Sequence, residues 1–176
     1  MRALWWIPTV ALTLASLVIL AFGVRQLDAP PPAAPAHTSP PAAAPPHTAD
    51  SAQQRSEVMT FGRTAAVRLL SYTSQNAQRD LTAAVDELTT DPFRDEYTDL
   101  IENAIVPAAT SEQVTTEAEV PALAVESLKP RSASLLVFVD IRTAMGSNKP
   151  STTTNAMRMK VEKEGDSWLV ADFDPL

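Results

Sequence analysis

The sequence contains no cysteine, which excludes disulfide bonds, thiolate nucleophiles and thiolate metal ligands. Histidine occurs only at His37 and His47, inside a proline-rich stretch whose composition does not fix a metal-binding geometry. The chain also lacks a nucleotide-binding loop, a zinc signature and a nucleophile elbow. These absences predict a protein with no metal site, no cofactor and no catalytic residues.

Runs of Lys or Arg are also missing, and the formal net charge is −7. The 14 basic and 21 acidic residues fall to 12 and 19 within residues 51–176, because Arg2, Arg25, Asp28 and Asp50 precede that region. A negative chain repels nucleic acid and anionic membrane surfaces. We therefore expect neither as a partner.

One long apolar run is present, from Leu4 to Val24, and it contains no charged side chain. A helix of this length reaches about 30 Å, which matches the hydrocarbon core of a bilayer. Tryptophans and arginines at the ends of such a run hold it at the membrane interface. The sequence predicts a transmembrane anchor over residues 1–27, with these interface residues: Arg2, Trp5, Trp6 and Arg25.

The alternative for this run is a cleaved signal peptide, with Ala34-Pro35-Ala36 or Ala42-Ala43-Ala44 as the cleavage motif. The run is longer than the apolar region of a typical signal, and Arg25 stands where the small-residue motif should begin. We therefore favour an uncleaved, single-pass anchor in the cell membrane. The N-terminus is expected inside and the C-terminal domain outside the cytoplasm.

Residues 28–50 are almost wholly Pro, Ala, Ser and Thr, a composition that favours extended polyproline II. This spacer can reach roughly 70 Å at about 3.1 Å per residue. Residues 51–176 then have the length of a single domain.

The first part of this domain has a helical period. Asp50 or Ser51 is expected to cap a long helix, whose apolar face would carry Val58, Phe61, Ala65, Leu69 and Tyr72. A second helix is expected over residues 78–88. A third should be capped by Asp91, start at Pro92, and end or kink at Pro107, with an apolar face of Phe93, Tyr97, Leu100, Ile101, Ala104 and Ile105.

Beyond Gln113 the period falls to two, which predicts antiparallel strands over residues 114–126, 133–143, 154–164 and 167–173. Pro121 should lie at a bulge or bend, and Gly165-Asp166 should form a two-residue hairpin loop. The stretch from Leu135 to Ile141 is apolar on both faces of the expected strand. This strand is therefore expected to be central in the sheet and covered on both faces at its start.

Helices followed by a curved antiparallel sheet define an α+β fold, expected here as about three helices on about four strands around a cone-shaped cavity. Tyr72, Tyr97, Asp140 and Arg142 are weak candidates for polar groups in that pocket. A buried Asp beside a tyrosine could abstract a proton next to a carbonyl. An exposed strand end explains Asp140 and Arg142 more simply, so an enzyme is not expected.

Five short motifs carry a family resemblance: VRLLSY at 67–72, DPFRDEY at 91–97, VTTEAEV at 114–120, LLVFVD at 135–140 and WLVADFDP at 168–175. Together with the span and spacer, they resemble the Mce-associated membrane proteins of mycobacteria and related actinobacteria. The resemblance implies an NTF2-like, VirB8-like domain outside the cytoplasmic membrane, and no catalytic residues.

The resemblance further implies a non-enzymatic accessory or stabilising subunit of an Mce complex, a machine that imports fatty acids or sterols. Its partners would be the Mce proteins of the cell envelope, with lipid as a possible ligand. Three alternatives remain open: a VirB8-like assembly factor of a secretion system, an NTF2-like isomerase or dehydratase, and a lipid-carrying domain.

Overall fold

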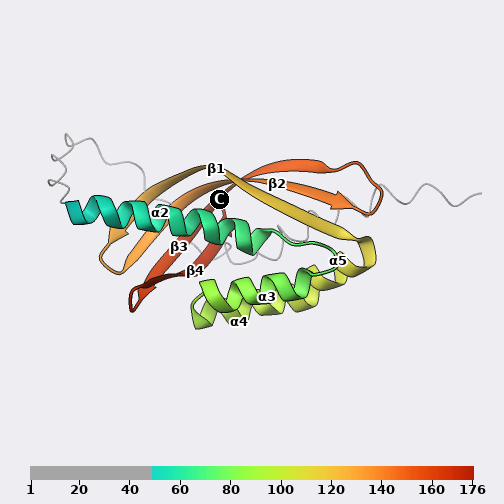
Figure 1. Cartoon of the computed structure of the whole chain (residues 1–176), viewed down its shortest axis with the longest axis horizontal. Coiled ribbons are helices and arrows are strands. Elements are labelled where there is room, and N and C mark those ends of the chain that lie inside the picture. Colours follow the sequence, from blue (N-terminus) through green and yellow to red (C-terminus); the bar gives the residue numbers. More distant parts are fainter. Residues whose placement is uncertain (1–48) are drawn as a thin grey trace, which may run out of the picture.

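The computed structural model describes residues 49–176, so the predicted membrane span, its four interface residues and most of the spacer lie outside the described residues. The helices are α2 (Ala49–Leu70), α3 (Ala77–Leu88), α4 (Asp91–Leu100), the π-helical turn η2 (Ile101–Ile105) and α5 (Val106–Glu112). The strands are β1 (Val114–Lys129), β2 (Ser132–Met145), β3 (Ser151–Glu164) and β4 (Ser167–Pro175). Helices first and strands second confirm the predicted α+β fold (Figure 1).

The four strands form one antiparallel sheet in the order β1-β2-β3-β4. Gly165 connects β3 to β4 with a φ of +58°, a conformation that glycine adopts without steric penalty, and this confirms the predicted hairpin. Along the four strands, one face buries apolar side chains against the helices and the other faces outward.

Two bulges in β1 keep its apolar side chains on the buried face. The first lies between Glu119 and Ala122 and includes Pro121, as predicted; the second lies between Val125 and Ser127. Each extra residue shifts the alternation by one position. Leu123, opposite Val137, therefore turns inward, whereas an unbroken alternation would point it outward.

Helix α2 lies across the inner face of the sheet, mainly over β1 and β2 (Figure 1). Val58, Ala65 and Leu69 are buried there, as predicted. Two expectations about this helix were wrong. Asp50 and Ser51 lie inside its first turn, because the helix already includes Ala49. Tyr72 lies beyond its end and forms a bridge with Thr116 of β1 instead.

The predicted third helix is interrupted but does not end at Pro107. The Val106 amide donates to the Ile101 carbonyl, which widens the turn to a π-helix just before Pro107. The proline then falls in the first turn of α5, where its missing N–H leaves no hydrogen bond unmade. The wider turn also rotates Ala104 to the exposed side, so its predicted place on the apolar face was wrong.

Two further expectations need correction, one about the start of α4 and one about β2. Thr90, not Asp91, precedes the first helical residue of α4, and Asp91 pairs with Arg94 instead of capping the helix. Strand β2 is central, but only its inner face is covered: Leu135 and Val137 are fully buried, whereas Phe138 is 38% exposed.

Candidate functional site

Two of the candidate polar residues, Tyr72 and Tyr97, lie on the helix side of the sheet. Tyr97 of α4 is buried, and its hydroxyl donates to the Leu69 carbonyl at 2.7 Å. Burial, and then the neighbouring Tyr72, raise the pKa of Tyr97. A phenol that holds its proton on a backbone carbonyl ties α4 to the last turn of α2 and is a poor base.

The other two candidates, Asp140 and Arg142, lie on the outward face of β2. Asp140 accepts a hydrogen bond from the Thr154 hydroxyl at 2.5 Å, and Arg142 lies 3.7 Å from the Glu117 carboxylate. The sheet therefore separates the tyrosines from the carboxylate and the guanidinium. The four residues are not assembled around one position, as proton abstraction next to a carbonyl would require.

The expected cone-shaped cavity is closed where α2 meets the sheet. A Cβ built on Gly62 would lie 2.4 Å from Cδ1 of Leu135 and 3.4 Å from Cδ1 of Leu123. The absence of a side chain at Gly62 therefore lets α2 approach β2 this closely without displacing Leu135. No room remains between them for even a methyl group, and a lipid cannot enter at this position.

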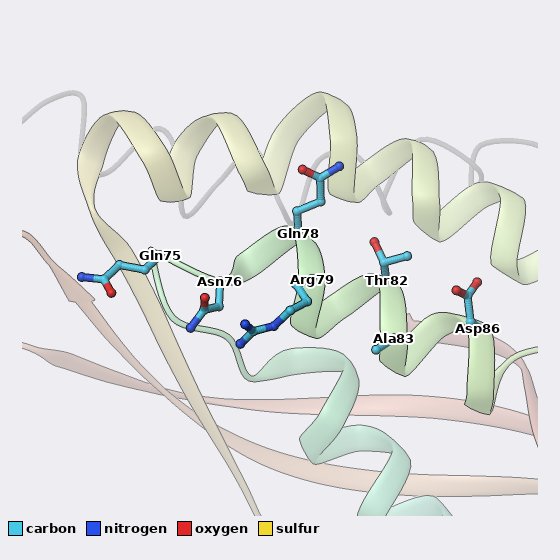
Figure 2. Close-up of a pocket in the computed structure, with 7 residues that line it drawn as sticks. All are labelled: Gln75, Asn76, Gln78, Arg79, Thr82, Ala83 and Asp86. Atoms are coloured by element: carbon cyan, nitrogen blue, oxygen red, sulfur yellow. The ribbon is translucent and has the colours of Figure 1, made fainter.

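A hollow that the structure does present lies on the exposed side of α3 (Figure 2). It is a shallow, open depression of about 620 Å³, lined by Gln75, Asn76, Gln78, Arg79, Thr82, Ala83 and Asp86. Arg79 is already paired with Asp80 at 3.0 Å. The depression exposes hydrogen-bonding groups but is open and lacks the enclosing walls of a small-molecule site.

A carboxylate pair on β4 was missed from the sequence. Partial burial, with the neighbouring Asp172 next, raises the pKa of Asp174 to about 6. Although partial burial opposes it, hydrogen bonds from Asp174 and Lys160 lower the pKa of Asp172. The signal available was Asp172-Phe173-Asp174, whose acids share one face of a strand, but their cationic neighbours are set by the β3–β4 register.

The membrane prediction falls outside this part of the chain. Within residues 49–176, the helices are all too short or too polar to cross a bilayer. Groups of three or more residues suited to holding a metal ion are likewise absent from residues 49–176.

Solved structures define the class of fold. The chain is similar to the periplasmic domain of DotI, with a TM-score of 0.60 and 16% identity over 69% of this chain and 94% of that one. It is also similar to VirB8 of Agrobacterium tumefaciens, with a TM-score of 0.55 and 14% identity over 75% and 96%. The described domain thus has a VirB8-like, NTF2-like fold.

Sequence comparison defines the family. Residues 43–171 match the family described as "Uncharacterized protein Rv1363c/MT1408-like", and the chain belongs to it. "Outer membrane protein Rv1973" of Mycobacterium tuberculosis is 31% identical over 127 residues, which are 72% of this chain and 79% of that one. "Uncharacterized protein Rv1362c" of the same species is 32% identical over 111 residues, 62% and 50% of the two chains.

Proposed function

We propose that this protein is a non-enzymatic accessory or stabilising subunit of an Mce-type lipid import complex, acting through protein contacts in the cell envelope. The observation that carries the non-enzymatic class is the separation of the four polar candidates by the sheet, together with the closed contact between Gly62 and Leu135. The Mce assignment rests on the five sequence motifs, and a relative named as an outer membrane protein supports a place in the envelope.

The proposed topology is an anchor over residues 1–27, a spacer over 28–50 and a domain over 51–176 that stands outside the cytoplasmic membrane. The DotI domain, which has a similar fold, is periplasmic, and this supports placing the domain outside the cytoplasmic membrane. A tether of this kind raises the local concentration of the domain near envelope partners.

The test compares three chromosomal versions: the full chain, the domain 51–176 exported without the anchor, and a deletion. Because a stabilising subunit works by holding a complex together, the abundance of the Mce proteins and lipid uptake should fall together in the second and third strains. Full uptake in the deletion strain would refute the proposal. Full uptake with the exported domain would refute the need for tethering.

A second candidate is a VirB8-like assembly factor of a secretion system, favoured by the fold shared with DotI and VirB8. The deletion separates the two candidates. Loss of protein secretion with unchanged lipid uptake would favour the assembly factor over the transporter subunit.

A further inference from the structure

The outward face of the sheet carries apolar side chains that no described helix covers. Phe138 is 38% exposed and Leu176 is 59% exposed, and they are the two large hydrophobic side chains exposed within residues 49–176. The register places both in one row across the sheet. Ala122 lies opposite Phe138, Phe138 opposite Ala156, and the Leu176 amide donates to the Ala156 carbonyl at 3.0 Å.

A neighbouring row adds Ala124 and Leu136, which lie opposite each other on β1 and β2. We call the two rows the outer patch: Ala122, Ala124, Leu136, Phe138, Ala156 and Leu176. Strands about 4.8 Å apart and rows about 7 Å apart give this patch an area of about 200 Å². Stable dimers bury about 800 Å² on each partner, so the outer patch has the size of a single bound segment.

Acidic side chains outnumber basic ones around the outer patch. They form cross-strand pairs on the same face, such as Arg158 with Glu126 at 3.1 Å, and leave an excess of carboxylates. We call them the acidic rim: Glu117, Glu119, Glu126, Asp140, Asp172 and Asp174, against the bases Arg142, Arg158 and Lys160.

Two carboxylates of the rim lie close together on β4. Asp174 lies opposite Arg158 and beside Asp172, with Lys160 of β3 and Glu96 of α4 also acting on it. Partial burial and Asp172 together raise the pKa of Asp174 to about 6 despite Lys160. A further positive charge at this position would lower the free energy of the ionised pair.

We propose that the outer patch and the acidic rim bind a short segment of another envelope protein, in which a few central apolar side chains are flanked on both sides by Lys or Arg. This inference rests on the proposed function, because it names the chemistry of the contact through which the subunit acts. A second copy fits less well, since it would bring one acidic rim against another. The rim repels anionic lipid headgroups for the same reason.

Binding of two synthetic peptides to the full chain tests this. The chain is held in zwitterionic nanodiscs, and the probes are fluorescent twelve-residue peptides with four central Leu residues flanked on both sides by Lys (the Leu/Lys peptide) or by Glu (the Leu/Glu peptide). Fluorescence anisotropy at about 0.15 M salt, corrected with empty nanodiscs, gives the two dissociation constants. We expect the Leu/Lys peptide to bind at least tenfold more tightly than the Leu/Glu peptide.

Matched variants locate the contact. Phe138→Ser should weaken binding of the Leu/Lys peptide at least tenfold, and Asp172→Asn combined with Asp174→Asn should weaken it while reducing its salt dependence. Phe138→Leu should restore most of the affinity. Gln78→Ser in the depression on α3 is the control and should leave the affinity unchanged.

Three results would overturn the inference. They are equal binding of both peptides, equal binding to the parent and to Phe138→Ser, and a dimer in sedimentation velocity that Phe138→Ser dissociates. The last result would assign the outer patch to a second copy. None of these results contradicts the proposed function, which is tested separately by the abundance of the Mce proteins in cells.

Discussion

Gly62 is the residue that sets the distance between helix and sheet. In Gly62→Ala the added methyl must displace the Leu135 side chain, because the built Cβ lies 2.4 Å from Cδ1 of that buried residue. Overpacking of this kind costs about 1 to 3 kcal/mol, against a gain of about 1 kcal/mol from the higher helix propensity of Ala. We expect a net loss of stability in urea unfolding of residues 51–176.

A double-mutant cycle provides the control for this prediction. Leu135→Ala should destabilise the parent by about 2 to 5 kcal/mol but should cost less in the Gly62→Ala background, because the new methyl fills part of the cavity. Additive effects would mean that the helix moves as a whole and that the two residues are not in direct conflict.

Trp168 on β4 anchors the end of the core, with 7% of its surface exposed and Lys163 5.8 Å from its ring centroid. Trp168→Ala should destabilise the domain by about 3 to 5 kcal/mol in chemical unfolding. Within residues 49–176 the indole N–H has no hydrogen-bond partner. Trp168→Phe should therefore cost much less than Trp168→Ala, and equal costs would point to a role for the indole nitrogen.

Asp174 should make stability fall as pH rises. Its pKa is raised to about 6 from the usual 3.8, so between these values the folded state binds more protons than the unfolded state. The stabilising effect of its proton is present below about pH 4 and lost by about pH 6. Asp174→Asn should raise the melting temperature at pH 7.5 relative to the parent, and more than at pH 4. An equal shift at both pH values would contradict the assignment.

At the scale of elements, periodicity predicted the number, order and type of the main helices and strands, because each has one apolar face. It could not predict η2, since the choice between an α-turn and a π-turn near Pro107 depends on how Ile101 and Ile105 pack. It also wrongly predicted that both faces of β2 are buried, because Leu136 and Phe138 are residue types that usually lie in a core.

The candidate site was less predictable than the fold. The sequence places Tyr72 and Tyr97 on helices and Asp140 and Arg142 on a strand, but it does not say which face of the sheet each pair reaches. That depends on which face of the sheet the helices cover and on the pairing register, which places Tyr72 beside Thr116 and Asp140 opposite Glu119. The Asp172 and Asp174 pair was missed because the raised pKa of Asp174 arises first from partial burial, and the lowered pKa of Asp172 depends in part on Lys160 of another strand.

The first bulge of β1 gives a test at this scale. Pro121 is exposed, so Pro121→Ala should change stability by less than about 1 kcal/mol. Deletion of residue 121 removes the extra position and leaves Val120, Leu123 and Val125 alternating inward in the same register, so this variant should still unfold cooperatively. Circular dichroism with thermal melting compares the two. Loss of cooperative unfolding in the deletion variant would mean that the bend at the bulge is itself needed for β1 to pack against α2.

At the scale of the whole molecule, the proposed topology predicts the side of the membrane on which the domain stands. Alkaline phosphatase fused after Leu176 should be active, because the enzyme folds only outside the cytoplasm, while a cytoplasmic reporter at that position should be silent. Placing the same fusion on a chain that lacks residues 1–27 is the control and should give no phosphatase activity. The reverse pattern would place the domain inside.

Helix α2 runs alongside β1 with the opposite chain direction. Near its start the Gln54 amide donates to the Lys129 and Pro130 carbonyls at 3.0 Å, and just past its end the Tyr72 amide donates to the Thr116 carbonyl at 3.0 Å. A pull along the axis of α2 is therefore resisted by contacts over the whole length of the helix, and these contacts would have to break at the same time. A pull applied at residue 49 would therefore reach the sheet through contacts along the whole of α2.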